Sequence, residues 1–421
     1  MTVNLPRWTL IVLCLGCVPA RGDSPAVIER VAILIDNNYV DAGKAHEIAA
    51  ALRNDARSGR FAKAVEPRDL AAALTVQLKS FDHHFNVTWS QAALPGAPPI
   101  PQEAAERRSN YGFRSVAMLP GAIGYIDMRT FVYLNFGKPE APARKAVDAA
   151  LTMVTDADAI ILDLRSNGGG LPAMVGYLVS AFTPAVPDIY NVIHRRDGIE
   201  SERPKDRYPA PRLDVPLYVL ISGRTASAAE STAYTLQAAK RAIIVGETSG
   251  GAANPGGEFP AGDGFDVFIS TGTPVNPITQ SNWERVGVKP DVAVPAGQAL
   301  ERAEILALEA VLAKDPDGKE ATDSRWVLEA LQAKQKPPPG PALTGYVGVY
   351  GDAEVAIVDG RLSLRRGPHP ALTMIRVRGD VFASDDEPFR RAIFERNATG
   401  KVIGFQWTRS SGQTSWYRRT G

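Results

Sequence analysis

Hydrophobic positions near the start of the chain recur every three or four residues, which is the spacing of one face of an α-helix. Between residues 26 and 81 they include Val27, Val31 and Ile35, and the segment "PRDLAAALTVQLKSF" continues the pattern. The pattern predicts a small helical lobe. The stretch that follows at 91–110, "QAALPGAPPIPQEAAERRSN", is too rich in proline and alanine for a core element and predicts a linker or crossing loop.

Further along, short continuous apolar runs alternate with longer amphipathic stretches. The runs are "AIGYIDM", "DAIILDL", "PLYVLIS" and "AIIVGE", and the intervening stretches are "APARKAVDAALTMV", "LPAMVGYLVSAF" and "SAAESTAYTLQAA". Runs without polar alternation, such as Ile160–Leu162, are typical of strands in a parallel sheet that helices cover on both faces. This part of the chain therefore predicts an α/β fold.

The last third of the chain changes character. Two helical stretches, at about 297–313 and 322–335, are followed by the stiff linker "KQKPPPGPALTG". From 342 to 421, short strands alternate with Gly, Asp and Asn turns, which predicts a separate antiparallel β domain. The predicted organisation is a signal peptide (1–20), a helical lobe with linker (21–105), an α/β core (106–296), a helical segment with linker (297–339) and a β domain (340–421).

The first twenty residues have the pattern of an export signal. Arg7 gives a positive start, "WTLIVLCLGCV" is an apolar core too short to span a bilayer, and "VPA" predicts cleavage after Ala20. The mature chain is therefore expected to be periplasmic or secreted, with no membrane span. The only cysteines, Cys14 and Cys17, lie inside this segment, so thiol catalysis and zinc–thiolate chemistry are excluded. A lipoprotein acylated at Cys17 is less favoured, because Cys14 stands where a lipobox normally has leucine.

Composition adds mainly exclusions. The 421 residues are 45% hydrophobic with a formal net charge of +1, as expected for a soluble globular protein of two or three domains. No basic cluster gives a footprint for nucleic acid. Assembly into a homo-oligomer stays open.

Two turns combine small residues with the carboxyl ends of predicted strands. "DLRSNGGG", 163–170, leaves backbone N–H groups uncovered between a strand and a helix, and it lacks the lysine and spacing of a phosphate loop. "GRTASAAES", 223–231, places Ser227 between alanines at a helix start, where the helix dipole stabilises developing negative charge. The alternative for Ser227 is a structural capping box with Glu230, in the pattern S-x-x-E.

A catalytic serine needs a base, and the chain has five histidines. His46 falls in the helical lobe, His369 in the β domain and His194 in a charged stretch, whereas His83 and His84 in "FDHHF" lie at a boundary between a helix and a strand. A histidine pair at such a boundary is more often structural than catalytic.

A third group is needed to orient the base. Glu284 in "NWERVGVKPDV" could hold a histidine or a water. The alternative is a surface glutamate paired with Arg285.

With these residues assembled, the sequence resembles the tail-specific, or C-terminal processing, serine peptidase family, over roughly residues 26–296. The motifs that carry the resemblance are "ILDLRSNGGG", "YVLISGRTASAAES", "KRAIIVGETSGGAANP" and "NWERVGVKPDV", in the family's order. The resemblance implies a ClpP/crotonase-like α/β core. It also implies a peptide or protein substrate and no metal or other cofactor.

The resemblance assigns roles to individual residues. The serine of "TASAAE" makes Ser227 the nucleophile, but the position of the processing proteases' lysine base falls on Ala252. "DHHFNV" is similar to the D-x-H-x-x-V of the tricorn-like branch, which implies His84 as the base, and "NWE" implies Glu284 as its support. The remaining implied residues are the oxyanion-hole donors Gly169, Gly170 and Ala228 and two polar relays, His83 and Ser281. No PDZ-like insertion fits between lobe and core.

Two other functions stay open. The repeats of interphotoreceptor retinoid-binding protein resemble this fold without acting as proteases, so the site could be vestigial and the chain could be a module that binds an apolar ligand. An esterase would use the same catalytic residues. The enzyme is favoured because a nucleophile, a base, a supporting carboxylate and both oxyanion elements occur in a plausible order.

Overall fold

The structure, a computed structural model, describes residues 24–90, 102–132, 136–185, 188–318 and 320–420. The chain divides into two compact units. Unit 1 combines the described residues up to Ser90 with Gly256–Thr271, and unit 2 contains the described residues 102–255 and those from Gly272 onward. The predicted signal peptide, with Cys14 and Cys17, lies outside the described residues. Within the described ranges, no helix is both long and apolar enough to cross a bilayer.

Unit 1 packs three helices against a small antiparallel sheet. The elements are α1 (Ser24–Asn38), α2 (Ala42–Arg57), α3 (Pro67–Leu78), β1 (Asn86–Trp89), β9 (Gly256–Gly262) and β10 (Phe265–Ser270), with strand order β1-β10-β9. Their apolar faces form one core, which includes Val27, Val31 and Ile35. The predicted helices of this lobe are confirmed, but the β9–β10 hairpin was not predicted. Its first strand, "GGEFPAG", lacks the regular apolar alternation that identifies a strand.

The central sheet of unit 2 has six strands in the order β12-β8-β7-β4-β3-β2. Their bounds are β2 (Phe113–Leu119), β3 (Ile123–Met128), β4 (Ala159–Asp163), β7 (Leu217–Ile221), β8 (Ile243–Gly246) and β12 (Val292–Ala293). All neighbouring pairs are parallel except β2 with β3. The predicted α/β fold is confirmed.

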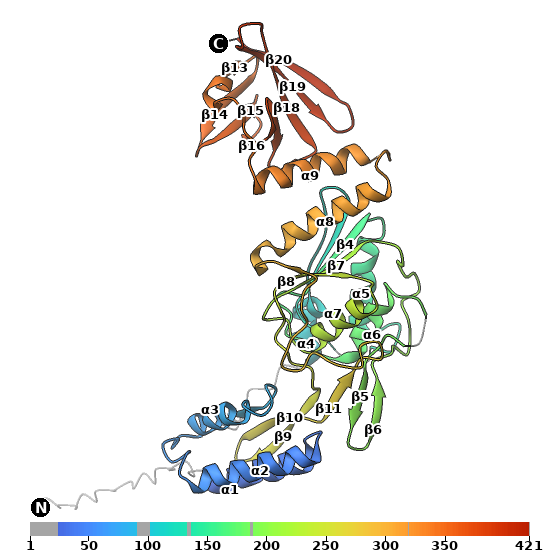
Figure 1. Cartoon of the computed structure of the whole chain (residues 1–421), viewed down its shortest axis with the longest axis vertical. Coiled ribbons are helices and arrows are strands. Elements are labelled where there is room, and N and C mark those ends of the chain that lie inside the picture. The colour runs from blue at the N-terminus through green and yellow to red at the C-terminus, as the bar shows by residue number, and fades with distance from the viewer. Residues whose placement is uncertain (1–23, 91–101, 133–135, 186–187, 319, 421) are drawn as a thin grey trace, which may run out of the picture. The chain divides into compact units, whose positions relative to one another are not determined.

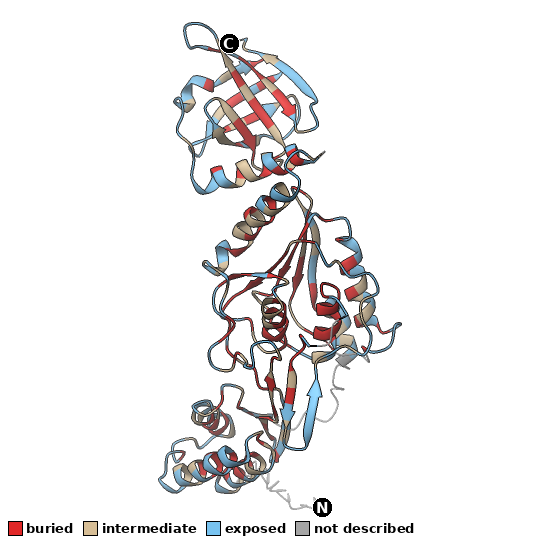
Figure 2. Ribbon diagram, turned by 45° about the vertical axis from the view of Figure 1, so that its right-hand side comes forward, coloured by how far each residue is buried: buried red, intermediate tan, exposed pale blue. Residues whose placement is uncertain are grey.

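Helices cover both faces of this sheet (Figure 1). They are α5 (Pro142–Met153), α6 (Pro172–Ser180) and α7 (Ala228–Ala238) on one face and α8 (Ala299–Lys314) on the other. Successive strand residues alternate between the two cores: Ile160 and Leu162 pack with α5–α7, and Ile161 packs with α8. Figure 2 shows the resulting burial of the strands. Burial on both faces explains the uninterrupted apolar runs in the sequence.

Two further elements of unit 2 were not predicted. A second sheet has the order β11-β5-β6, with β5 (Val192–Arg195), β6 (Gly198–Ser201) and β11 (Gly272–Val275). The prediction of a linker over 91–110 is wrong for α4 (Gln102–Arg108), which is helical. Its "EAAERR" run consists of strong helix formers, and they decide the local structure although prolines precede them. Residues 91–101 lie outside the described residues.

The C-terminal residues form an antiparallel barrel. Eight strands each pair with the next: β13 (Gly348–Tyr350), β14 (Ala353–Val358), β15 (Arg361–Arg366), β16 (Leu372–Arg378), β17 (Val381–Ser384), β18 (Arg390–Arg396), β19 (Val402–Arg409) and β20 (Thr414–Arg418). A bridge between Tyr350 and Arg419, together with the Thr420 N–H bonded to the Val349 carbonyl at 2.8 Å, joins the two ends. Aromatic side chains fill the interior. The predicted antiparallel β domain is confirmed.

Arg391 joins the barrel to α9 (Ala321–Gln335). Its guanidinium is buried, donates to the carbonyls of Pro388 (2.7 Å) and Trp326, and lies 4.9 Å from the centre of the Trp326 ring. Burial lowers the pKa of Arg391 to about 10, and the Glu329 carboxylate, 3.7 Å away, opposes that shift. A buried charge with several partners is costly to break.

Replacing this guanidinium should therefore destabilise the barrel. We expect Arg391→Ala to lower the free energy of unfolding by about 3 kcal/mol, because it leaves the carbonyls of Pro388 and Trp326 without this donor and empties a buried site. Denaturant unfolding measures this. The matched control is Arg365→Ala, which removes an exposed ion pair with Glu354 and should cost less than about 1 kcal/mol. Equal effects of the two substitutions would contradict this role of Arg391.

Candidate active site

Ser227 lies in a strained turn between β7 and α7. Its backbone has φ 55° and ψ −122°, a conformation that non-glycine residues rarely adopt and that costs about 1–3 kcal/mol. Such strain persists only where the surroundings impose it, and it is typical of active sites. The side chain is half-buried at the amino end of α7, beside the carboxyl end of the parallel sheet.

Hydrogen bonds attach this turn to the glycine turn that follows β4. The Thr225 hydroxyl donates to the Leu164 carbonyl (2.8 Å), the Ala226 N–H donates to the Asn167 carbonyl (3.1 Å), and the Ser222 hydroxyl donates to the Arg165 carbonyl (2.6 Å). Because β4 and β7 are neighbouring parallel strands, their following turns meet at one edge of the sheet. The two turns at the ends of these strands therefore lie together in unit 2.

Glycine is required where the two turns touch. Gly169 has φ 108°, and a Cβ at this position would lie 2.6 Å from the Ser227 Cβ and 3.1 Å from the Ala228 nitrogen. The Gly169 N–H donates to the Asn167 side-chain oxygen at 2.9 Å, so it is already engaged. The amides of Gly170 and Ala228 have no hydrogen-bond partner among the described residues. They are the backbone donors that this arrangement offers to an anion.

Glu230 is the buried residue that fixes the serine. Its carboxylate accepts the Ser227 N–H at 2.9 Å, as in a capping box. It also accepts three groups of a second loop, namely the Ser249 hydroxyl (2.5 Å) and the N–H groups of Gly251 (2.7 Å) and Ala252 (2.9 Å). The capping-box interpretation is therefore correct but incomplete, because one side chain holds both the Ser227 turn and the 249–252 loop.

Glu284 holds the next residues of the same loop. Its Oε2 accepts the N–H groups of Ala253 (2.8 Å) and Asn254 (3.2 Å). Ala252, at the position of the processing proteases' lysine, is the last residue that Glu230 holds and directly precedes the two residues that Glu284 holds. Ser281, predicted as a relay, is exposed and forms an isolated bridge with Asn276.

In unit 1, His84 pairs with Asp82. The His84 Nδ1 lies 3.3 Å from an Asp82 carboxylate oxygen, and the His84 backbone N–H donates to the same oxygen at 2.8 Å. Asp82 is buried, which raises its pKa, but hydrogen bonds from His84 and Ser270 outweigh burial and hold that pKa at about 2. A carboxylate at Nδ1 favours a proton on that nitrogen and leaves Nε2 as the basic one.

The structure thus distributes the predicted residues over both units. Ser227, Ala228, Gly169 and Gly170 come together in unit 2, and Glu284 holds a loop that also contacts Glu230. His84 lies in unit 1, next to an exposed His83. Sequence reasoning missed Asp82 and the wider role of Glu230. Asp82 is the first residue of the D-x-H-x-x-V pattern, so that motif contained a signal for it.

Comparison with known proteins finds peptidases that are similar to this part of the chain. Residues 122–294 match the model of "Peptidase family S41". A carboxyl-terminal-processing protease of Synechocystis sp. is 30% identical over 217 residues, covering 50% of this chain and 48% of that protein. Another, from Picosynechococcus sp., is 29% identical over 175 residues, covering 41% and 39%. A chloroplastic carboxyl-terminal-processing peptidase 2 of Arabidopsis thaliana is 30% identical over 186 residues, covering 42% and 34%. The chain spans less than half of the length of these relatives.

Removing the charge of Glu230 should destabilise the Ser227 turn. In Glu230→Gln, an amide NH₂ replaces one acceptor oxygen and faces backbone donors, so we expect a loss of about 2–4 kcal/mol in the free energy of unfolding. Denaturant unfolding measures it. Glu247→Gln is the control, because Glu247 is exposed and accepts a single backbone N–H, that of Ala296. The role assigned to Glu230 fails if Glu230→Gln is no more destabilising than this control.

The lowered pKa of Asp82 predicts a pH dependence. Its folded value of about 2 lies below the ordinary 3.8, so the ionised carboxylate stabilises the fold above about pH 5 and loses this contribution as the pH falls towards 2. The shift corresponds to about 2 kcal/mol. We expect the difference in unfolding free energy between wild type and Asp82→Asn to shrink between pH 6 and pH 3. A difference that is constant with pH would contradict the pairing.

Proposed function

We propose, from the match of residues 122–294 to peptidase family S41, that the protein is an exported serine-type peptidase that hydrolyses peptide bonds through an acyl-enzyme at Ser227. The observation that carries the proposal is the strained serine, which lies against a glycine turn with the open amides of Gly170 and Ala228 beside it. A helix cap alone has no need of a left-handed backbone or of a glycine at the point of contact.

The proposed reaction begins with proton transfer. In the catalytic state His84 takes the Ser227 proton through Nε2, and the Ser227 oxygen attacks the substrate carbonyl. His84 then gives the proton to the leaving amine, and water hydrolyses the acyl-enzyme by the same steps in reverse. Asp82 supports this role, because its ionised carboxylate at Nδ1 stabilises the imidazolium that forms. His83 is the adjacent polar relay.

The tetrahedral oxyanion would rest on backbone amides. Ala228 contributes the N–H at the start of α7, where the helix dipole favours negative charge. From the glycine turn, Gly170 is the donor that is open in this conformation, and Gly169 would contribute if the Asn167 side chain moved away. Removing one such donor typically costs a factor of about 10²–10³ in rate.

Glu284 is the proposed support on the unit 2 side. Held by the amides of Ala253 and Asn254, its carboxylate has a fixed orientation, from which it would favour the imidazolium directly or through a hydroxyl such as Ser281. The chain has alanine at position 252, so the Ser–Lys dyad of the processing proteases is replaced by a histidine-based arrangement that resembles the tricorn-like branch. A substrate C-terminus would then be recognised without a PDZ domain.

A fluorophosphonate probe tests this proposal, because it labels only an activated serine. We expect the purified mature protein to be labelled at Ser227, Ser227→Ala to show no labelling, and His84→Ala to be labelled at least about 100-fold more slowly. The rate of labelling, followed by mass spectrometry, is the measurement. His194→Ala is the matched control, since His194 is exposed on β5 and should leave the rate unchanged.

The alternative functions give different results. A binding module for apolar ligands would not be labelled in any form of the protein. Equal labelling of wild type and His84→Ala would mean that another residue is the base. An esterase would be labelled in the same way as a peptidase but would cleave ester substrates and leave peptides intact.

A further inference from the structure

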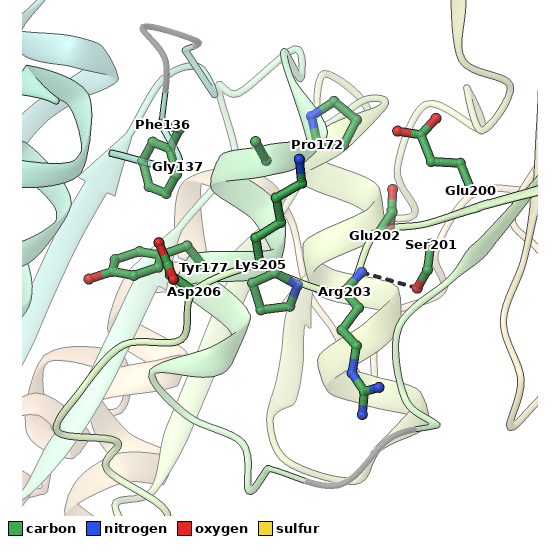
Figure 3. Close-up of a pocket in the computed structure, with 12 residues that line it drawn as sticks. Phe136, Gly137, Pro172, Tyr177, Glu200, Ser201, Glu202, Arg203, Lys205 and Asp206 are labelled. Atoms are coloured by element: carbon green, nitrogen blue, oxygen red, sulfur yellow. Dashed lines mark hydrogen bonds between the residues drawn. The ribbon is translucent and has the colours of Figure 1, made fainter. Parts of the chain in front are cut away.

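A pocket opens beside the glycine turn of unit 2, with a volume of about 250 Å³. Figure 3 shows its lining, which includes Phe136, Pro172, Tyr177, Lys205 and Asp206. Its volume lies below the roughly 300–1,000 Å³ of pockets that hold drug-sized molecules. It therefore suits one amino-acid side chain or the end of a peptide.

Its lining is connected to the candidate active site through α6 and α7. Pro172, the first residue of α6, comes two positions after Gly170. On the other side, the Glu202 carboxylate accepts the hydroxyl of Ser231 at 2.5 Å, and Ser231 lies one helical turn after Ser227 on α7. The lining thus includes the first residues of α6, and one of its carboxylates is bonded to α7, the helix that begins after Ser227.

The part of the pocket wall that α6 forms is closely packed. Gly176 allows the segment after β6 to lie directly on this helix, because a Cβ there would be 2.3 Å from the Glu202 carbonyl oxygen. Tyr177, the next residue of α6, meets the ring of Phe136 edge to face, with centroids 5.1 Å apart. An apolar side chain would bind here at a low entropic cost, because the walls are already in place and need not be ordered on binding.

The carboxylates of the lining have their partners outside the lining and do not pair with its two cations. Each carboxylate has a partner: Glu200 pairs with Arg195 (3.1 Å), Asp206 pairs with Arg144 (3.0 Å), and Glu202 accepts from Ser231 and from Asn191 (2.8 Å). Burial also raises the pKa of Glu202, which reduces the negative charge that it contributes.

The two cations of the lining are in the opposite situation. Within the part of the chain that the structure describes, the side chains of Arg203 and Lys205 have no ion-pair or hydrogen-bond partner. Figure 3 shows the Lys205 side chain extended towards Pro172, whereas the Arg203 side chain points away from it. The charge left uncompensated at the pocket is therefore positive, at Lys205.

We propose that this pocket binds a carboxylate of the peptide substrate through Lys205, with the apolar wall of Phe136 and Tyr177 contacting the residue that carries it. The carboxylate is either an acidic side chain or the free C-terminus of the peptide. The inference deepens the proposed function, on which it rests, by giving the peptidase a preference for an anionic group close to the bond that Ser227 attacks.

Peptide binding to the Ser227→Ala protein tests the pocket separately from catalysis. The probes are fluorescein-labelled heptapeptides of Ala, Val and Leu that carry Glu or Gln at one internal position, stepped along the sequence, and end in a free acid or an amide. We expect one anionic form to bind about three- to tenfold more tightly than its neutral counterpart in fluorescence polarisation. A preference for Glu identifies the side chain as the ligand, and a preference for the free acid identifies the C-terminus.

Substitutions at Lys205 then decide whether the pocket is responsible. Lys205→Met should abolish the preference, and Lys205→Glu should reverse it, while Lys336→Met, an exposed lysine at the end of α9, should leave it unchanged. Equal binding of anionic and neutral peptides, or a preference that survives in Lys205→Met, would overturn the inference. A Lys205-dependent preference in a protein that no fluorophosphonate labels would leave the pocket standing and refute the peptidase.

Discussion

The candidate site depends on one buried carboxylate. Glu230 accepts four hydrogen bonds, one from the strained Ser227 amide and three from the 249–252 loop. A buried carboxylate is stable only when such donors satisfy it, so the fold must keep both segments in place around it. Ser227, whose N–H Glu230 accepts, has a positive φ and lies directly against Gly169. The hydrogen bonds of Glu230 thus help to position the Ser227 turn, the proposed site of the nucleophile.

The loop held by Glu230 is also where the chain passes from one unit to the other. Glu284 holds Ala253 and Asn254, and after Pro255 the chain enters β9 of unit 1. Unit 1 carries the Asp82–His84 pair, in which a buried, ionised aspartate fixes the imidazole. In the proposed mechanism, the nucleophile and the oxyanion donors therefore come from unit 2, and the base comes from unit 1.

Much of this arrangement could be predicted from the sequence, for local reasons. Continuous apolar runs identified β4 and β7, and glycine and alanine runs after them identified the two turns that meet. The β9–β10 hairpin could not be found, because its glycines and proline hide the strand pattern and its partner β1 is far away in sequence. The role of Glu230 was underestimated for a related reason. The spacing S-x-x-E reports only the helix cap, whereas the three other donors come from about twenty residues later.

The central proposal is that His84 of unit 1 acts as the general base for Ser227 of unit 2. A peptidyl chloromethyl ketone tests this proposal most directly. Such a reagent binds as a substrate, adds to the nucleophilic serine and alkylates the histidine that acts as its base. Peptide mapping by mass spectrometry should find the alkyl group on His84 in the wild-type protein, and this modification should be lost in Ser227→Ala. Modification of Ser227 without alkylation of His84, or alkylation of another histidine that depends on Ser227, would contradict the account.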